Sequence, residues 1–371
     1  MRVALNLSFL APGETGGMEV YARELARALA ARDDIELVLL GNRLLDDAWP
    51  EVERIVMPVD PRRRVEWVLG DQLHAPRAAR RARADLVHSL ASTGPVTGRP
   101  VRVTTIHDLN YRFVPESHFG LRGLGMRILV PLAARRSQRL IVDAESTRRD
   151  LCRHLGTSSA KVDVAPLAAR VPRDPQTTAE PELRERLELG ERSIVLSLSA
   201  KRPHKNLARL LRAVAELQPE RRPALVVPGY PTSHERDLRE LADRLGIGGL
   251  VRLPPWLSAA DVEGLYRAAA CVVFPSLYEG FGLPVLEAMA RGVPVACSDR
   301  SSLPEVAGDA ALLFDPEDVG AIRTALARLL TDPALAERLR VAGRDRAAQF
   351  TWERTAELTV RCYRRALASA A

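Results

Sequence analysis

Apolar residues in this chain follow two alternating patterns. Short, mostly apolar runs such as residues 3–7, 35–40 and 270–274 have the length and composition of buried parallel strands. Longer segments lie between them, for example residues 18–31, in which apolar positions recur every three or four residues opposite charged ones. This spacing predicts amphipathic helices, and strands alternating with helices along the whole chain indicate an α/β protein with parallel sheets.

The two halves of the chain are predicted to contain similar series of elements. In the first half we expect strands at residues 3–7, 35–40, 55–58, 84–88, 101–107, 140–144 and 161–166, and helices at 18–31, 65–83, 121–136 and 146–154. In the second half we expect strands at 193–199, 224–228, 251–253, 270–274, 294–298 and 311–314, and helices at 206–217, 233–245, 258–268 and from Pro284. Three further helical segments end the chain.

A linker is predicted between the halves. Residues 169–181 contain three prolines and several charges but no apolar period. We therefore expect two Rossmann-like, doubly wound domains, at residues 1–168 and 182–351. In such folds ligands bind beyond the carboxyl ends of the strands, so two domains facing a central cleft would line it with their strand-exit loops.

Composition narrows the possible partners. The net charge of +7 comes mainly from arginine and suits phosphorylated substrates, an anionic membrane surface or nucleic acid. Nucleic acid is disfavoured because the arginines are spread along helices without an accompanying aromatic–basic motif. Basic stretches at residues 77–83 and 122–139 carry interleaved apolar residues and could contact anionic lipid peripherally. We favour the simpler interpretation, solvated helix faces packed on a sheet.

The cysteines and the N-terminus favour a cytoplasmic protein, with any membrane contact at the inner face. Four cysteines stand far apart without metal-type or redox-type spacing, as expected for reduced packing residues. Met1 and Arg2 lead directly into the first predicted strand, which leaves no room for a signal peptide. No apolar run approaches the roughly 20 residues that span a bilayer.

Residues 275–287 form the most informative loop. They follow an apolar strand, contain Gly280 and Gly282, and lead into a helix expected to begin at Pro284. A glycine loop before a helix presents backbone N–H groups and a positive dipole end to an anion. Glu279 and Glu287 bracket this loop with seven residues between them, and acids beside an anion site suit the hydroxyl groups of a sugar or ribose.

The two glutamates differ in their structural alternatives. Glu287 is expected in the first turn of the helix, where the dipole stabilises an acid by roughly 0.3–1 kcal/mol whatever its function. Glu279 precedes the helix and has no such explanation, so it is the stronger functional candidate.

A basic cluster follows the first strand of the second half. Lys201, Arg202 and Lys205 lie together with His204 at one strand exit, and holding a diphosphate is their natural use. A solvated basic turn would explain single members of this cluster. It explains the whole group poorly, because the cations repel one another unless an anion is present.

Three loops of lesser weight complete the candidates. Gly16 and Gly17 lie at the first strand-to-helix turn and permit close approach to a phosphate, although they form no G-x-G-x-x-G fingerprint and a flexible turn is the alternative. His107 leaves a strand at its carboxyl end, where we favour a functional role, whereas Asp108 is expected to cap the next turn. Residues 301–306 are expected to support the site without chemistry of their own.

Together these motifs resemble the family 4 retaining glycosyltransferases of the GT-B fold. Residues 279–287, read as E-G-F-G-L-P-V-L-E after Pro275-Ser276, resemble the E-x7-E signature of that family. Gly16-Gly17-Met18-Glu19 is similar to its N-terminal glycine loop and His107-Asp108 to its HD element. Further similarities cover nearly the whole chain: residues 202–206 to the phosphate-binding region, 301–313 to the segment after the signature, and 350–353 to the start of the final helix.

The resemblance implies a role for each domain. The first domain, completed by a final helix at residues 352–371 that crosses back to it, would bind the acceptor, and the second would bind a nucleotide diphosphate sugar. Lys205 would contact the diphosphate, Glu287 the ribose, and Glu279 and His107 the transferred sugar. The implied catalytic residues are Glu279, His107 and Lys205, and the implied substrate-binding residues are Gly16, Gly17, Lys201, Arg202, Lys205, Glu279, Gly280, Phe281, Gly282, Leu283 and Glu287.

One departure leaves an alternative open. Ser199-Ala200 stands where the family often has Gly-Arg, so either Lys201 or Arg202 supplies the second phosphate contact.

The implied reaction is transfer with retention to an acceptor hydroxyl on a glycan, a lipid-linked sugar or a small molecule. It would use no metal and no cofactor, and the acceptor would attack from the same face with help from the leaving diphosphate. Two alternatives are a GT-B nucleotide-sugar epimerase and a catalytically silent nucleotide-sugar-binding protein.

Overall fold

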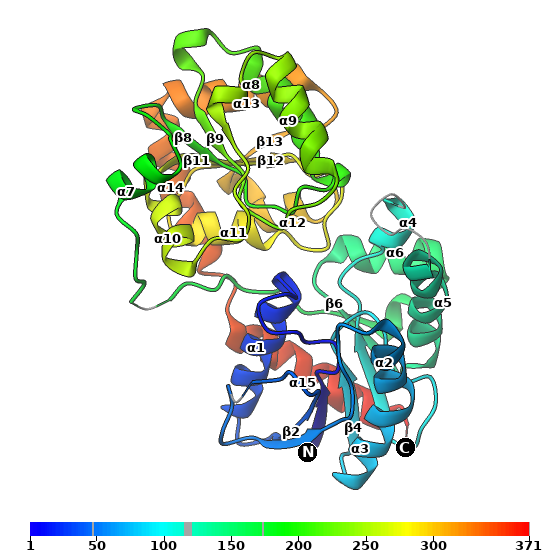
Figure 1. Ribbon diagram of the computed structural model, residues 1–371. Helices are drawn as coiled ribbons and strands as arrows, with labels where there is room; N and C mark the ends of the chain where they lie inside the picture. Colours follow the sequence, from blue (N-terminus) through cyan, green and yellow to red (C-terminus); the bar gives the residue numbers. More distant parts are fainter. Residues whose placement is uncertain (47, 115–120, 173, 371) are drawn as a thin grey trace. The chain divides into compact units, whose positions relative to one another are not determined.

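The computed structural model describes residues 1–46, 48–114, 121–172 and 174–370 (Figure 1). The chain divides into two compact units. Unit 1 comprises Met1–Leu167 together with Phe350–Ala371, and unit 2 comprises Ala168–Gln349. Within the predicted linker, Arg173 lies outside the described residues, and residues 169–172 and 174–179 form neither helix nor strand.

Unit 1 is built on a parallel sheet of seven strands in the order β3-β2-β1-β4-β5-β6-β7. Its strands are β1 (Arg2–Asn6), β2 (Glu36–Gly41), β3 (Glu53–Val56), β4 (Leu86–Ser89), β5 (Val101–Thr105), β6 (Arg139–Val142) and β7 (Val162–Val164). Its helices are α1 (Gly17–Ala30), α2 (Arg64–Leu69), α3 (Ala75–Arg81), α4 (Asn110–Phe113), α5 (Leu121–Arg136), α6 (Glu145–Leu155) and α15 (Trp352–Ala368). The strand order reverses between β1 and β4.

The final helix belongs to unit 1, as predicted. Helix α15 packs against α1 and strands β5, β6 and β7, and Tyr363 at its centre is fully buried. The Tyr363 hydroxyl lies 2.7 Å from Nδ1 of His88 on β4. Thr355 at the start of the helix donates through Oγ1 to the Pro166 carbonyl at 2.6 Å.

The helix predicted at residues 65–83 is interrupted. The structure has α2, then a π-helical turn at Gly70–His74, then α3. Pro76 has no N–H to continue the α-helical ladder, and a wider π turn precedes it. The π turn brings the carboxylate of Asp71 inward, where it accepts hydrogen bonds from Asn6, Ser8 and Thr93.

Unit 2 repeats the architecture with six parallel strands in the order β10-β9-β8-β11-β12-β13. Its strands are β8 (Ile194–Leu196), β9 (Ala224–Val226), β10 (Val251–Arg252), β11 (Ala269–Phe274), β12 (Val295–Ser298) and β13 (Leu312–Phe314). Its helices are α7 (Glu180–Arg186), α8 (Leu207–Ala215), α9 (His234–Arg244), α10 (Ala259–Ala268), α11 (Leu283–Ala290), α12 (Leu303–Ala307), α13 (Val319–Thr331) and α14 (Pro333–Ala347). Here the order reverses between β8 and β11.

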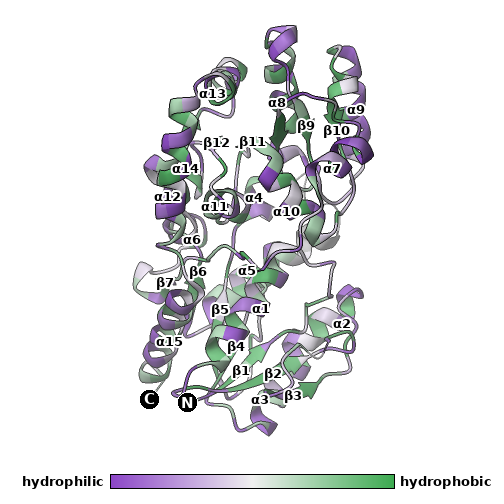
Figure 2. Cartoon of the chain, turned by 90° about the vertical axis from the view of Figure 1, so that its left-hand side faces the viewer, coloured by the Kyte–Doolittle hydropathy of each residue, from purple (hydrophilic) through white to green (hydrophobic). Residues whose placement is uncertain are grey.

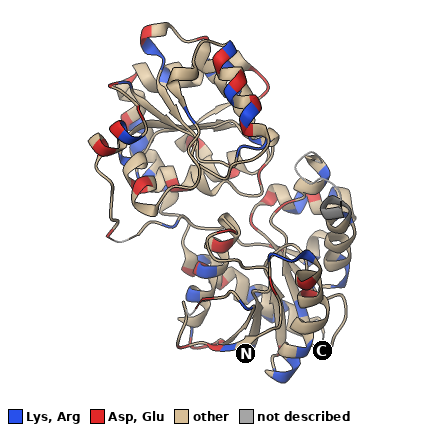
Figure 3. Cartoon of the chain, in the orientation of Figure 1, with Lys and Arg blue, Asp and Glu red and all other residues tan. Residues whose placement is uncertain are grey.

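The predicted fold class, two doubly wound α/β domains, is confirmed. Strands such as β9 are coloured mainly hydrophobic in Figure 2, whereas α9 is mainly hydrophilic. One side of the unit 2 sheet packs on apolar residues of α8, α9 and α13, with Cys271 and Val273 of β11 in the same cluster. Basic and acidic residues alternate along α9 (Figure 3), where Arg239 pairs with Glu235. In the part of the chain that the structure describes, none of the helices combines the length and the apolar character of a membrane span.

Candidate active site

The strand reversal of unit 2 brings two predicted loops together. The loop after β8 carries Lys205 and the loop after β11 carries Glu279, and strands β8 and β11 are hydrogen-bonded neighbours. Leu277 donates its N–H to the His204 carbonyl at 2.8 Å, and Asn206 donates through Nδ2 to the Pro275 carbonyl at 3.0 Å. Ligands of doubly wound folds bind at this reversal point, so these paired loops form the candidate site.

A cation and an acid face each other across the paired loops. Nζ of Lys205 donates to Oε1 of Glu279 at 2.5 Å, and both side chains are mostly buried. The ammonium group also lies 5.4 Å from the centre of the Phe274 ring. The residue that sequence analysis assigned to the diphosphate and the one assigned to the sugar therefore lie in direct contact.

Glycine is required where this loop enters α11. Gly282 has a φ of 110°, and a Cβ there would lie 2.6 Å from Cδ2 of Leu303. The helix begins at Leu283 with Pro284 in its first turn, one residue before the predicted start. Pro284 has no N–H, and the N–H groups of Val285 and Leu286 donate to the Gly282 carbonyl at 3.0 and 3.3 Å. The start of the helix therefore offers an anion the Leu283 N–H and the positive end of the helix dipole.

Two serines of the predicted supporting loop orient the site. The Ser301 and Ser302 hydroxyls donate to the Glu279 carbonyl at 2.6 and 3.1 Å, and Ser302 also reaches the Phe281 carbonyl at 2.7 Å. In a trans peptide the N–H points opposite to the C=O. The N–H groups of Gly280 and Gly282 consequently point away from these serines.

Lys201 is placed differently from its predicted role. Its side chain is fully buried, and Nζ donates to the carbonyls of Gly229 and Pro254 at 2.7 and 2.6 Å. Burial lowers the pKa of Lys201, and Glu235 at 3.7 Å offsets part of this effect. A cation that satisfies two buried carbonyls is a structural element. Arg202, the other alternative for the second phosphate contact, is partly exposed.

Glu287 lies in the second turn of α11, so the expectation of first-turn dipole stabilisation is wrong. The Tyr266 hydroxyl donates to its Oε2 at 3.3 Å, and the Arg291 guanidinium stacks over the Tyr266 ring at 4.6 Å. Burial raises the pKa of Glu287 to about 7, although Arg291 and the Tyr266 hydrogen bond favour its charged form. A carboxyl group with this pKa changes charge near neutral pH.

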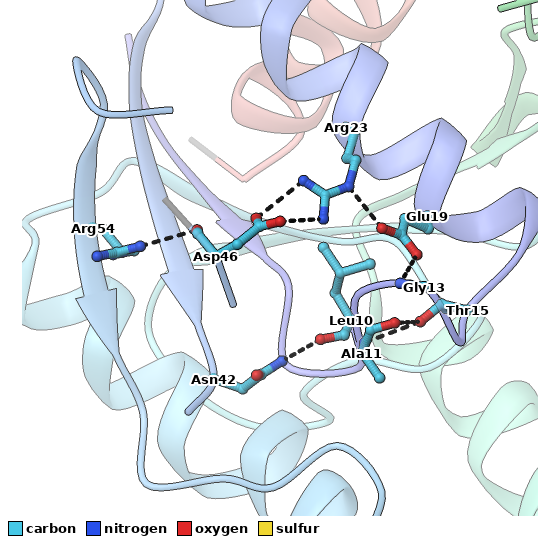
Figure 4. A network of polar contacts seen from close by, with 9 residues as sticks. All are labelled: Leu10, Ala11, Gly13, Thr15, Glu19, Arg23, Asn42, Asp46 and Arg54. Atoms are coloured by element: carbon cyan, nitrogen blue, oxygen red, sulfur yellow. Dashed lines mark hydrogen bonds and ion pairs between the residues drawn. The ribbon is translucent and has the colours of Figure 1, made fainter. Parts of the chain in front are cut away.

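In unit 1 the predicted glycine loop is held in place by the polar network of Figure 4. Glu19 accepts from the Gly13 N–H at 2.8 Å and from Nε of Arg23 at 2.8 Å. Arg23 continues to Asp46 through two hydrogen bonds of 2.7 and 3.0 Å. Gly16, with φ 62°, then precedes α1, which begins at Gly17. The loop is therefore braced and not merely a flexible turn.

His107 leaves β5 and is held by hydrogen bonds to both ring nitrogens. Nδ1 lies 2.6 Å from Oδ2 of Asp143, and Nε2 lies 2.7 Å from the Leu90 carbonyl. Tyr21 of α1 packs edge-on against the imidazole, with ring centres 5.0 Å apart. Asp108 stabilises the next turn as expected, through an Asx turn in which its Oδ1 accepts from the Asn110 N–H at 2.9 Å, although the N-cap residue of α4 is Leu109.

Several residues around these sites were not anticipated from the sequence. No short motif includes Asp143, Tyr266, or the pair of half-buried Tyr230 and exposed Trp256, whose rings lie 4.9 Å apart in the loops after β9 and β10. For Asp143, Tyr230 and Trp256, the position in a loop that follows a strand was the available signal, because polar or aromatic residues there lie at the ligand-binding edge. Tyr266 lies within α10, before β11, and has no such signal.

Comparison with known proteins decides the family. Residues 15–169 match the family described as Glycosyltransferase Family 4, and residues 179–346 match Glycosyl transferases group 1. The chain is 32% identical over 368 residues to the O-antigen chain mannosyltransferase B of Escherichia coli, with 94% of this chain and 96% of the relative covered. The chain is a family 4 glycosyltransferase of the GT-B fold.

Two further similarities extend over the whole transferase. It is 29% identical over 425 residues to the MMP alpha-(1->4)-mannosyltransferase of Mycolicibacterium hassiacum, with 100% of both chains covered. It resembles the solved structure of Anabaena HepE in complex with UDP-glucose, with a TM-score of 0.75, 18% identity and coverage of 98% of this chain and 99% of that one. At this identity the second likeness concerns the fold.

The burial of Lys201 yields a prediction that separates it from Arg202. Lys201→Met removes the donor to the Gly229 and Pro254 carbonyls, of which the Pro254 oxygen keeps a longer hydrogen bond from the Gly229 N–H at 3.4 Å. It should lower the free energy of unfolding by about 2–4 kcal/mol. Arg202→Met should stay within about 0.5 kcal/mol of the wild type. Urea denaturation followed by circular dichroism measures both, and equal stabilities of the two variants would contradict the structural role of Lys201.

Proposed function

We propose that this glycosyltransferase moves a sugar with retention from a nucleotide diphosphate sugar, bound by unit 2, to an acceptor hydroxyl. The observation that carries the proposal is the Lys205–Glu279 pair at the strand reversal, beside the N-terminus of α11. An ammonium group and a helix N-terminus suit a diphosphate, and a neighbouring carboxylate suits sugar hydroxyls.

The proposed chemistry follows from where charge develops. As the bond between the sugar and the phosphate breaks, negative charge grows on the leaving diphosphate and positive charge on the sugar. The negative charge on the diphosphate is stabilised by Lys205 and by the N–H groups of Phe281, Gly282 and Leu283. The carboxylate of Glu279, which lies beside Lys205, stabilises the positive charge on the sugar. Preorganised charges of this kind act most strongly in the transition state.

We propose a metal-independent reaction with attack from the same face as the leaving group. The leaving diphosphate, held by Lys205 and Arg202, then accepts the proton of the acceptor hydroxyl, and no covalent intermediate on Glu279 is formed. The cations of the β8 exit supply the charge that a metal would otherwise provide.

The donor is proposed to be a nucleotide-activated hexose. Two relatives along the whole chain are named as mannosyltransferases, and the structural neighbour HepE was solved with UDP-glucose. Glu287 is proposed to hold the ribose hydroxyls. Trp256, which is 59% exposed and stacks on Tyr230, offers an aromatic face for the base.

Unit 1 is proposed to bind the acceptor, which is a glycan, a lipid-linked sugar or a small molecule. Gly16, Gly17 and His107 lie at strand exits of this unit and are its proposed contributors.

A cytoplasmic location with peripheral contact to an anionic membrane is also proposed, since α5 exposes Ile128 and Leu132 among basic residues such as Arg135.

The proposed function is tested with a panel of uridine, guanosine, adenosine and thymidine diphosphate sugars. Thermal stabilisation and slow release of free sugar in water identify the donor, and the assay is run with and without EDTA. A donor that binds without any turnover would point to a silent binding protein, and conversion of the donor without acceptor would point to an epimerase. If no nucleotide sugar binds, the proposal fails.

Lys205→Ala should lower kcat by roughly 10²–10³-fold, because one charge contact to the leaving group is lost. Arg323→Ala removes an exposed cation of α13 that pairs with Glu216, and it serves as the matched control with normal kcat. Steady-state kinetics with the identified donor measures both. Near-normal turnover of Lys205→Ala would remove Lys205 from the mechanism.

Glu287 gives donor binding a distinct pH dependence. With a pKa of about 7 in the free protein, Glu287 is mostly protonated at pH 6 and mostly ionised at pH 8, and only the ionised form accepts hydrogen bonds from both ribose hydroxyls. The affinity for the nucleotide sugar should therefore rise by about five- to tenfold from pH 6 to pH 8. Calorimetry measures this rise, which Glu287→Gln should abolish; an equal rise in that variant would assign it to another group.

A further inference from the structure

His107 has a hydrogen-bonding pattern that restricts its protonation state. A backbone carbonyl can only accept, so Nε2, 2.7 Å from the Leu90 oxygen, must carry a proton. Nδ1 faces the carboxylate of Asp143 at 2.6 Å. The remaining question is where the proton between Nδ1 and Oδ2 resides.

The burial of Asp143 decides which atom carries the proton between Nδ1 and Oδ2. Its side chain is 2% exposed, and among the described residues its other oxygen, Oδ1, has no hydrogen-bond partner. A buried carboxylate without a cation is strongly disfavoured, and His107 is the cation within reach. The proton is best placed on Nδ1, which makes the pair an imidazolium and a carboxylate.

We propose that Asp143 is a positioning residue that keeps His107 as an imidazolium, with both N–H groups donating to the protein. His107 then acts as a fixed positive charge beside α1 and not as a proton acceptor. This inference rests on the proposed function in one respect: the anionic group attracted by that charge would belong to a substrate of the transferase.

The surroundings of His107 are consistent with a stable cation. Burial opposes the charge, but Asp143, the Leu90 carbonyl and Asp108 together outweigh it and raise the pKa of His107. From β4, His88 is fully buried with a pKa of about 3 and stays neutral, hydrogen-bonded to Tyr363 and Thr105. From α1, the Tyr21 ring lies edge-on, and burial raises the pKa of its hydroxyl, which also stays neutral.

The His107 imidazolium lies close to helix α1. Tyr21 lies just after the first turn of α1, which begins at Gly17, so the imidazolium lies near a helix N-terminus of the same sign. Asp143 and Glu19, the latter in the first turn of α1, offset part of this positive potential. The imidazole is 13% exposed, so an anionic group can approach its free edge.

The pair also links stability to pH. Because the pKa of His107 is higher in the folded chain than its ordinary value of about 6.5, the pair contributes its full stabilisation below that pH. The contribution is lost as the pH rises through the folded-state pKa.

The test is an NMR titration of the free, full-length protein labelled with ¹³C at the Cε1 position of histidine. The chain has seven histidines, so at most seven signals appear, and His107→Gln assigns the one of interest. In the wild type, His107 should titrate above 6.5. In Asp143→Asn its pKa should fall by about one unit or more, since one opposite charge at this distance is removed.

Asp143→Glu keeps the charge and should restore most of the elevated pKa, which a loss of packing alone would not do. The high-pH limit of turnover should move in parallel with the measured pKa in these variants. A wild-type His107 that titrates at or below 6.5, or a pKa unchanged in Asp143→Asn, would overturn the proposal. Neither result depends on a donor, so the outcome is separate from that of the nucleotide-sugar panel.

Discussion

The candidate site in unit 2 depends on the hydrogen bonds that join the loops following β8 and β11. Two hydrogen bonds join the loops, one from the Leu277 N–H to the His204 carbonyl and one from Asn206 to the Pro275 carbonyl. The Ser302 hydroxyl then donates to the carbonyls of Glu279 and Phe281. Because these contacts fix the backbone, Lys205 and Glu279 meet without having to be ordered by the ligand, and preorganisation of this kind lowers the cost of binding.

Charges near the sites fall into two classes that residue type alone does not distinguish. Lys201 and Lys205 lie four positions apart, yet the first is fully buried and donates to two backbone carbonyls, whereas the second pairs with Glu279 and stays partly exposed. Glu279 and Glu287 likewise differ, since one pairs with a cation and the other is half-buried and accepts a hydrogen bond from Tyr266. In each pair the surroundings of the group, and not its chemistry, set its role.

Much of the architecture could be predicted from the sequence. Apolar runs with helical segments between them predict both parallel sheets. The signature at residues 279–287 predicts the family, and the backbone conformation explains its Gly282, at the N-cap of α11, and its Pro284, in the first turn. The burial of Lys201 could not be predicted, since it depends on the carbonyls of Gly229 and Pro254, 28 and 53 residues away along the chain. The contact between His107 and Asp143 could not be predicted either. The two residues follow neighbouring strands, and the local periodicity of the sequence does not determine the order of the strands in the sheet.

The central claim, that the loops after β8 and β11 together bind the donor, is tested most directly by hydrogen–deuterium exchange. The full chain is compared with and without the nucleotide sugar that it turns over. The account predicts slower exchange at residues 202–207 and 280–286, with residues 219–223 at the opposite end of the unit 2 sheet unchanged. Unaltered exchange in both loops under saturating donor, with turnover intact, would contradict it.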